Sequence, residues 1–173
     1  VRLYHQSGDP RWLLKAIEAL SVSLALNPLD ARFASRLGAI HVLLADHAGG
    51  EEERAVRLGK AADYYEQSMQ LDPYSPFNYL ELGKLRWAQR RADEAQAWFR
   101  RATSYEPNFL PARVRLAELL LQTGHKEVAL LEYTESVKIK ARYQGRTLNS
   151  LERQYLDVDL DQLKDALALA GAL

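Results

Sequence analysis

A pattern that repeats every ~34 residues runs along this chain of 173 residues and constrains its fold more than any other feature. Ala61, Ala95 and Ala129 are evenly spaced by this period, and an aromatic residue follows each of them four positions later. Periods of about 20–50 residues are typical of repeat proteins, in which each repeat is a small unit that cannot bury its apolar face alone. The sequence therefore predicts stacked, similar units. The positions that carry the repeat are Gly38, Ala61, Tyr65, Tyr79, Leu82, Gly83, Ala95, Phe99, Ala102, Pro107, Ala129 and Tyr133.

One step of the repeat is longer than the others. The step from Gly38 to Gly83 exceeds the period because 11 extra residues lie between Gly38 and Ala61. The insertion falls within 46–60, where a Gly-Gly pair indicates a turn and the three glutamates after it suit the positive end of a starting helix. An insertion of this length is about three turns of 3.6 residues, so a helix lengthened by it keeps the same face inward. We therefore expect two lengthened helices here.

Composition and helix signals predict an all-α fold. Ala, Leu, Glu, Arg and Gln dominate, and strand-like alternation is scarce. Asp9, Asp30 and Ser75 are typical N-caps, and Gly124 is a typical helix end. The expected helices span residues 10–26, 31–46, 51–71, 76–89, 93–105, 110–123, 126–140, 148–156 and 160–170.

The same signals predict a row of repeats followed by a cap. Within 1–141 we expect a partial repeat at 1–29, a long repeat with the insertion at 30–75, and further repeats at 76–109 and 110–141. Most of the first helix of the partial repeat is missing, which predicts a fragment of a longer chain. Residues 142–173 are expected to form C-terminal capping helices with a polar exterior, because an end cap must cover the last apolar face.

The segment 79–107 resembles a tetratricopeptide repeat (TPR), whose pattern is W-x2-L-G-x2-Y, then A-x3-F, an Ala and a Pro. The matching residues are Tyr79, Leu82, Gly83, Ala95, Phe99, Ala102 and Pro107. Arg86 departs from the second aromatic position, and the repeat at 110–141 matches more loosely. The resemblance covers roughly residues 10–141 and implies a right-handed α-solenoid, a superhelix of antiparallel helix pairs. In such a pair, Gly83 would let the second helix approach at Ala95 and Ala102.

Composition and charge argue against several classes of function. Lys+Arg and Asp+Glu both number 23, which argues against nucleic-acid binding driven by bulk charge, and no cysteine is present for disulfides or thiolate metal sites. No apolar run approaches the ~18 residues of a membrane helix. The four histidines share no i, i+4 pair, and no catalytic or phosphate-binding motif occurs. We therefore expect no enzymatic activity, metal or cofactor in this chain.

A basic stretch spans residues 84–115, with eight bases and three acids. Such a stretch is typical of a solvated outer face and of the turns between helices. The alternative is a surface for an acidic partner or for the head groups of an anionic membrane.

The resemblance implies that the first helices of successive repeats line a concave face, which takes an extended peptide or a partner helix. The candidate protein-binding residues share one helical face on each of two repeats. They are Phe77, Leu80, Lys84 and Trp87 on one repeat and Val114, Glu118, Leu121 and Gln122 on the next, with Arg32, Ser35, Ala39 and Val42 on the preceding repeat.

The first four of these residues are expected to form a partly exposed patch. An extended segment with apolar side chains and an acid that pairs with Lys84 would suit it. The alternative for Trp87 is packing on a neighbouring repeat. The family's Lys and Asn clamp for a free C-terminal carboxylate is absent from this face.

These observations predict a non-catalytic protein–protein interaction scaffold that binds a peptide or a partner helix. The alternative is a soluble accessory domain of a bacterial membrane protein. The runs at 71–85 and 105–124 are similar to the tails of O-antigen ligase/polymerase-like proteins, which would link the domain to cell-surface polysaccharide assembly. Attachment to an inner membrane would then come only through another part of the chain. The partner's identity, the compartment and the oligomeric state do not follow from the sequence.

Overall fold

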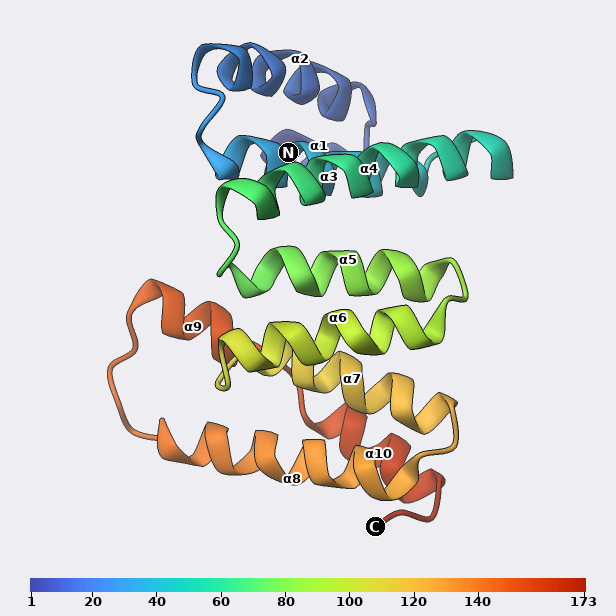
Figure 1. Cartoon of the computed structure of the whole chain (residues 1–173), viewed down its shortest axis with the longest axis vertical. Helices are drawn as coiled ribbons and strands as arrows, with labels where there is room; N and C mark the ends of the chain where they lie inside the picture. The colour runs from blue at the N-terminus through green and yellow to red at the C-terminus, as the bar shows by residue number, and fades with distance from the viewer. The chain divides into compact units, whose positions relative to one another are not determined.

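The computed structural model describes residues 1–173 as helices joined by short turns, without strands (Figure 1). The chain forms two compact units, unit 1 at Val1–Asn78 and unit 2 at Tyr79–Leu173. The expected all-α solenoid of stacked helix pairs is confirmed. The helices are α1 (Arg2–Ser7), α2 (Arg11–Leu26), α3 (Ala31–Ala45), α4 (Glu51–Leu71), α5 (Pro76–Ala88), α6 (Ala92–Tyr105), α7 (Leu110–Gln122), α8 (Lys126–Arg142), α9 (Ser150–Leu156) and α10 (Asp161–Leu169).

The inserted residues lengthen one helix far more than the other. Helix α4 has 21 residues against 14 in α6, its counterpart in the next repeat, whereas α3 has 15 against 13 in α5. Both helices are therefore longer than their counterparts, as expected, although α4 takes nearly two extra turns and α3 only two residues. The short helix α1 occupies the segment expected to be a remnant of a missing helix.

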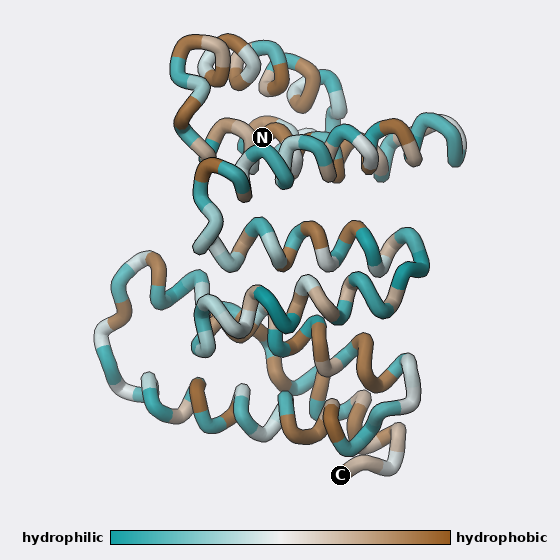
Figure 2. The backbone as a smooth tube through the Cα atoms, in the orientation of Figure 1, coloured by the Kyte–Doolittle hydropathy of each residue, from teal (hydrophilic) through white to brown (hydrophobic).

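Unit 1 is organised around α3, which packs against both α2 and α4. Leu13, Ile40 and Leu44 form a buried cluster, with partly buried side chains from α1 and α2 packed against it. The hydroxyl of Ser68 donates a hydrogen bond of 2.9 Å to the backbone carbonyl of Ala31, which ties the end of α4 to the start of α3. Hydrophobic and hydrophilic residues mix along each helix, as expected where only one face is covered (Figure 2).

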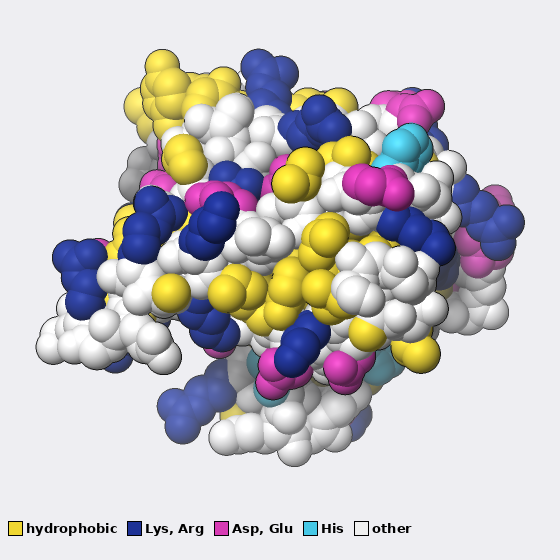
Figure 3. Space-filling view, turned by 90° about the horizontal axis from the view of Figure 1, so that it is seen from below, with side chains coloured by type: hydrophobic (Ala, Val, Ile, Leu, Met, Phe, Trp, Pro, Cys, Tyr) yellow, Lys and Arg dark blue, Asp and Glu magenta, His cyan; other side chains and the backbone are white.

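In unit 2, α7 packs against α6 and α8, and the C-terminal helices α9 and α10 pack on this pair. Leu156, Leu163 and Leu167 are buried there. The end that carries α8 and α10 nevertheless shows hydrophobic side chains among charged ones (Figure 3). Leu131 is 67% exposed and Leu169 is 91% exposed. The expected polar exterior of the cap is therefore wrong for this end, because α9 and α10 cover only part of α8.

Two helical glycines make room for aromatic rings. A Cβ atom added at Gly83 would lie 2.4 Å from Cε1 of Phe99, and one added at Gly38 would lie 3.0 Å from Cε1 of Tyr65. Both rings are buried. The second helix thus approaches Gly83 most closely through Phe99, and not through Ala95 or Ala102 as expected. The atoms nearest to it belong to the ring of Phe99, which extends further from α6 than the methyl groups on the same helical face.

Side-chain caps mark several helix starts. The Asp30 carboxylate accepts the backbone N–H of Arg32 at 3.0 Å and caps α3, as expected. The Asp9 carboxylate accepts the backbone N–H of Arg11 at 2.9 Å at the start of α2. At α9, Asn149 forms a capping box with Glu152, which moves the start of this helix from the expected residue 148 to Ser150.

Two helix ends share one hydrogen-bond pattern with different residues. Gly124 ends α7 with φ 83°, and its N–H and that of His125 donate to the carbonyls of Leu121 and Leu120, a Schellman motif. The expected helix end at Gly124 is thus confirmed. Arg90 occupies the same position of the preceding repeat, adopts φ 61° and closes α5 with the same pair of bonds. A non-glycine residue therefore holds the left-handed position at the end of α5.

Candidate functional site

The candidate binding residues on α5 and α7 meet at one groove of unit 2, which we call the α5–α7 groove. It measures about 270 Å³. Four of the eight expected residues line it, namely Leu80 and Lys84 from α5 and Val114 and Glu118 from α7. The remaining lining residues are Pro111 and Arg115 from α7 and Asp157, Val158, Asp159 and Gln162 from the segment between α9 and α10 and the start of α10.

The floor of the groove is apolar and buried. Leu80 is 4% exposed and Val114 is 9% exposed. The expectation that Leu80 belongs to a partly exposed patch is therefore wrong, because the face of α5 that carries it is covered. A ligand in the groove would meet these side chains only at their edges, and the more exposed groups around them would make most of its contacts.

Trp87 lies beside the groove and has two roles in the structure. Its ring packs edge-on against buried Phe99, with 6.1 Å between ring centroids. Its Nε1–H donates a hydrogen bond of 3.0 Å to Oε1 of Gln122, which joins α5 to α7. The ring also lines a second, shallower hollow with Lys84, Ala88 and Arg115. Trp87 is thus half-buried, and one part of it faces this hollow.

The cations of the groove already have partners on their own helices. Lys84 forms an ion pair of 2.6 Å with Glu81, and Arg115 forms one of 2.7 Å with Glu118. Asp157 and Asp159 form no ion pair, and their carboxylates therefore add uncompensated negative charge to one end of the groove. The groove consequently has an aromatic end near Trp87 and an acidic end at the C-terminal segment.

The other four expected residues do not line the α5–α7 groove: Trp87 and Gln122 lie beside it and are joined by a hydrogen bond, and Phe77 and Leu121 lie elsewhere. Phe77 belongs to unit 1, where it lines a separate hollow with Arg32, Ser35 and Ser68 among others. The expectation of one patch from Phe77 to Trp87 is therefore wrong. Leu121 is partly buried and lines neither hollow of unit 2 described above. Helical spacing groups Phe77 with Trp87 on one face of α5 but does not indicate the point where α5 passes from one unit to the other.

Sequence reasoning missed the contribution of the C-terminal segment. Residues 157–160 lie between α9 and α10 and outside the repeat, so no periodic signal placed them beside α5 and α7. Arg115 and Pro111 could have been found, since they lie one and three residues from Val114 on the same helix.

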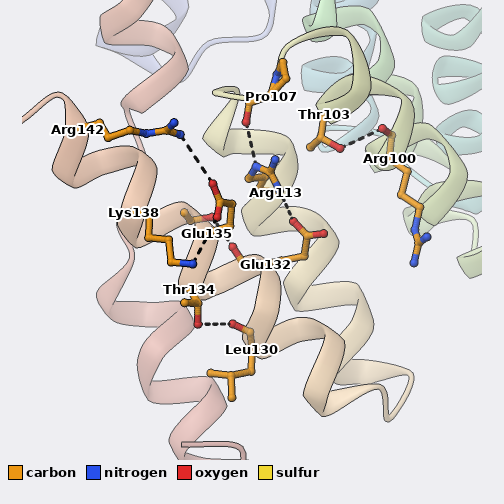
Figure 4. A network of polar contacts seen from close by, with 11 residues as sticks. Arg100, Thr103, Pro107, Arg113, Leu130, Glu132, Thr134, Glu135, Lys138 and Arg142 are labelled. Carbon is orange, nitrogen blue, oxygen red and sulfur yellow. Dashed lines mark hydrogen bonds and ion pairs between the residues drawn. The ribbon is translucent and has the colours of Figure 1, made fainter.

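The basic stretch at 84–115 is largely neutralised by ion pairs. Arg91 pairs with Glu94 at 2.5 Å, and Arg113 pairs with Glu132 at 2.6 Å. The guanidinium of Arg113 also donates to the backbone carbonyl of Pro107, and a further group of charges lies close by on α8 (Figure 4). These contacts favour the solvated-face interpretation of the stretch over a surface for an anionic partner.

The titratable side chains of the chain do not converge on a metal site. No group of three or more His, Cys, Asp or Glu side chains is placed to hold a metal ion. No helix is both long and apolar enough to cross a membrane. The groove itself holds carboxylates, one lysine and one arginine, without a histidine or a serine beside them.

Comparisons with known proteins agree with this fold. Residues 86–133 match the family model of the tetratricopeptide repeat. The chain is similar to TTC0263, a thermophilic TPR protein in Thermus thermophilus, with 22% identity and a TM-score of 0.67 over 99% of this chain and 87% of that chain. A crystal structure of MamA is similar with 17% identity and a TM-score of 0.62, over 97% and 92% of the two chains. No curated protein matches the chain in sequence. The resemblance to the tetratricopeptide repeat is thus confirmed.

Proposed function

We propose that this chain is a non-catalytic scaffold whose α5–α7 groove binds an extended peptide segment of a partner protein. The observation that carries the proposal is the convergence of Lys84, Val114 and Glu118 from two successive first helices at one groove, with Trp87 beside it. Stacked helical repeats use such extended surfaces for binding. Because the similar solved structures share only 22% and 17% identity with this chain, the fold alone, and not a partner, is carried over from them.

The charges of the groove favour a particular kind of peptide. An apolar or aromatic side chain would contact the edges of Leu80 and Val114 and the ring of Trp87. A basic side chain would suit the acidic end at Asp157 and Asp159, where two carboxylates lack ion-pair partners. A base is therefore proposed in place of the expected acid, because Glu81 already pairs with Lys84 at 2.6 Å.

A displayed library of random peptides would test the proposal. We expect the selected peptides to combine an apolar or aromatic residue with a basic one, and we expect Trp87→Ala to weaken their binding about thirtyfold, as for a buried aromatic anchor. Since Trp87 also packs on Phe99, its truncation can reduce stability. Asp157→Asn with Asp159→Asn is therefore the second variant, and it should weaken basic peptides without unfolding the chain.

A matched control separates the groove from general charge effects. Asp93→Asn removes an exposed carboxylate from the first turn of α6, outside the groove, and should leave peptide affinity unchanged. If this control weakens binding as much as the Asp157/Asp159 variant does, or if Trp87→Ala keeps full affinity, the groove is not the binding site.

The accessory-domain alternative stays a prediction of the sequence alone. The descriptions of the matching family and of the similar structures name tetratricopeptide repeats and MamA and do not mention glycan transfer.

A further inference from the structure

Unit 1 contains a hollow that the proposed function does not use, which we call the His41 pocket. It measures about 510 Å³ and lies among α2, α3 and α4. Its α2 side carries Leu14, Ile17 and Glu18, and its α4 side carries Arg57, Lys60, Asp63 and Tyr64. The residues that matter here are Leu14, Ile17, His41, Arg57, Lys60 and Tyr64.

His41, which lines the pocket, has a buried ring nitrogen without a hydrogen bond. His41 is 4% exposed, and its ring stacks on Tyr64 with 5.6 Å between centroids and an angle of 14° between planes. The Nδ1 atom of His41 is buried and has no hydrogen-bond partner. Buried polar atoms are nearly always hydrogen-bonded, so a nitrogen without a partner on a residue that lines a pocket calls for a partner that the chain itself does not supply.

The charges near the imidazole are positive. Burial lowers the pKa of His41, and Arg57 and Lys60 lower this pKa further, so the ring is neutral near pH 7. Lys60 forms no ion pair, and Arg57 reaches only Glu53, at 3.5 Å. Glu18 and Asp63 also line the pocket, and neither forms an ion pair with Arg57 or Lys60.

In the next repeat, a carboxylate of the chain itself lies at the position equivalent to this pocket. Arg86 occupies the repeat position of His41, and Glu94 occupies that of Lys60. There the carboxylate of Glu94 lies 3.4 Å from Nε of Arg86, within ion-pair distance, although this Nε, like Nδ1 of His41, makes no hydrogen bond. In unit 1 the residue at the position of Glu94 is a lysine, so the carboxylate that completes the site in unit 2 has no counterpart.

We infer that the His41 pocket binds a carboxylate carried on a short aliphatic stem. The carboxylate would lie between the cations of Arg57 and Lys60 and accept a hydrogen bond from a ring nitrogen of His41. The stem would contact Leu14 and Ile17, as the apolar wall of the pocket requires. Both a free small acid and a glutamate side chain of a partner have this chemistry.

Proton NMR with butyrate as the probe tests this inference. We expect the imidazole signals of His41, assigned with His41→Phe, to shift saturably with butyrate and not with butyramide, its neutral analogue. A capped peptide Ala-Glu-Ala is compared with Ala-Gln-Ala in the same way. Binding of butyrate alone identifies a free acid as the source, and selective binding of the glutamate peptide identifies a partner's side chain; either outcome supports the inference.

Substitutions of Lys60 test whether its charge is needed for butyrate binding. Lys60→Glu places a carboxylate where unit 2 has Glu94 and should weaken butyrate binding at least tenfold, and Lys60→Gln should weaken it less. Lys15→Glu makes the same charge change at an exposed site of α2 outside the pocket and should leave the affinity within twofold. Equal shifts with butyramide, or unchanged affinity in folded Lys60→Glu, would overturn the inference.

Discussion

In both units a helical glycine packs against an aromatic ring, but the space between glycine and ring differs. In unit 1, a Cβ built on Gly38 lies 3.0 Å from the ring of Tyr65, and in unit 2 a Cβ built on Gly83 lies 2.4 Å from the ring of Phe99. Distances near 3.0 Å require a neighbour to give by a few tenths of an ångström, whereas 2.4 Å requires the ring to move. The same repeat position is therefore far less tolerant in unit 2, although both sequences read Leu-Gly.

The units also differ in which charged side chains lack ion-pair partners. Unit 1 has the longer second helix and keeps Lys60 without an ion pair beside His41, whereas unit 2 has Glu94 at the repeat position of Lys60, 3.4 Å from Nε of Arg86. Unit 2 instead leaves carboxylates of its C-terminal segment unpaired beside the α5–α7 groove. Repeats with one backbone plan thus leave different charged groups without ion-pair partners, a lysine in unit 1 and two aspartates in unit 2.

The largest expected effect sharpens the contrast between the two glycines. Gly83→Ala should destabilise the chain by about 1–2 kcal/mol, because overpacking against Phe99 exceeds the gain in helix propensity. Gly38→Ala should change stability by less than about 0.5 kcal/mol, because the smaller clash and the propensity gain nearly cancel. Chemical denaturation measures both.

Two variants provide controls for this contrast. Gly59, in the middle of α4, has no atom within 4 Å of a Cβ built on it, so Gly59→Ala should stabilise by about 1 kcal/mol through propensity alone. Phe99→Leu in the Gly83→Ala background should cost less than in the wild type, because the smaller side chain relieves the clash. Strict additivity of these two substitutions would contradict the glycine–ring account.

The next effect compares the turns that end α5 and α7. A left-handed conformation costs a residue with a Cβ about 1 kcal/mol relative to glycine. Arg90→Gly should therefore stabilise the chain by about 1 kcal/mol, and Gly124→Arg should destabilise it by a similar amount. If both substitutions shift the denaturation midpoint in the same direction, the shared Schellman geometry is not what sets their energies.

The smallest effect concerns the cap of α3. The Arg32 side chain and backbone N–H, as hydrogen-bond donors, lower the pKa of Asp30 from 3.8 to about 2. A folded pKa below the unfolded one stabilises the native state above the unfolded value, and this stabilisation is lost as pH falls toward the folded value. The stability difference between wild type and Asp30→Ala should therefore be present at pH 6 and shrink between about pH 4 and 2. A difference that stays constant over this range would exclude the charged cap.

The repeat period made the helices predictable. Most of their bounds lie within two residues of expectation, since alanine, aromatic and proline positions recur in step with the repeat. The partner of Gly83 was not predictable, because the reach of the Phe99 ring depends on the distance between helices. Phe77 was misplaced because its spacing from Leu80 defines a helical face but not the unit boundary at Asn78 and Tyr79. The acidic end of the groove comes from a segment outside the repeat.

The indole N–H signals of the tryptophans test the central claim most directly. The chain has three tryptophans, and only the Nε1–H of Trp87 lies beside the α5–α7 groove, where it donates to Gln122. On titration with a selected peptide, we expect the Trp87 indole signal to shift saturably while the signals of Trp12 and Trp98 stay in place. Saturable shifts of Trp12 or Trp98 with an unmoved Trp87 signal would place the peptide elsewhere and contradict the account.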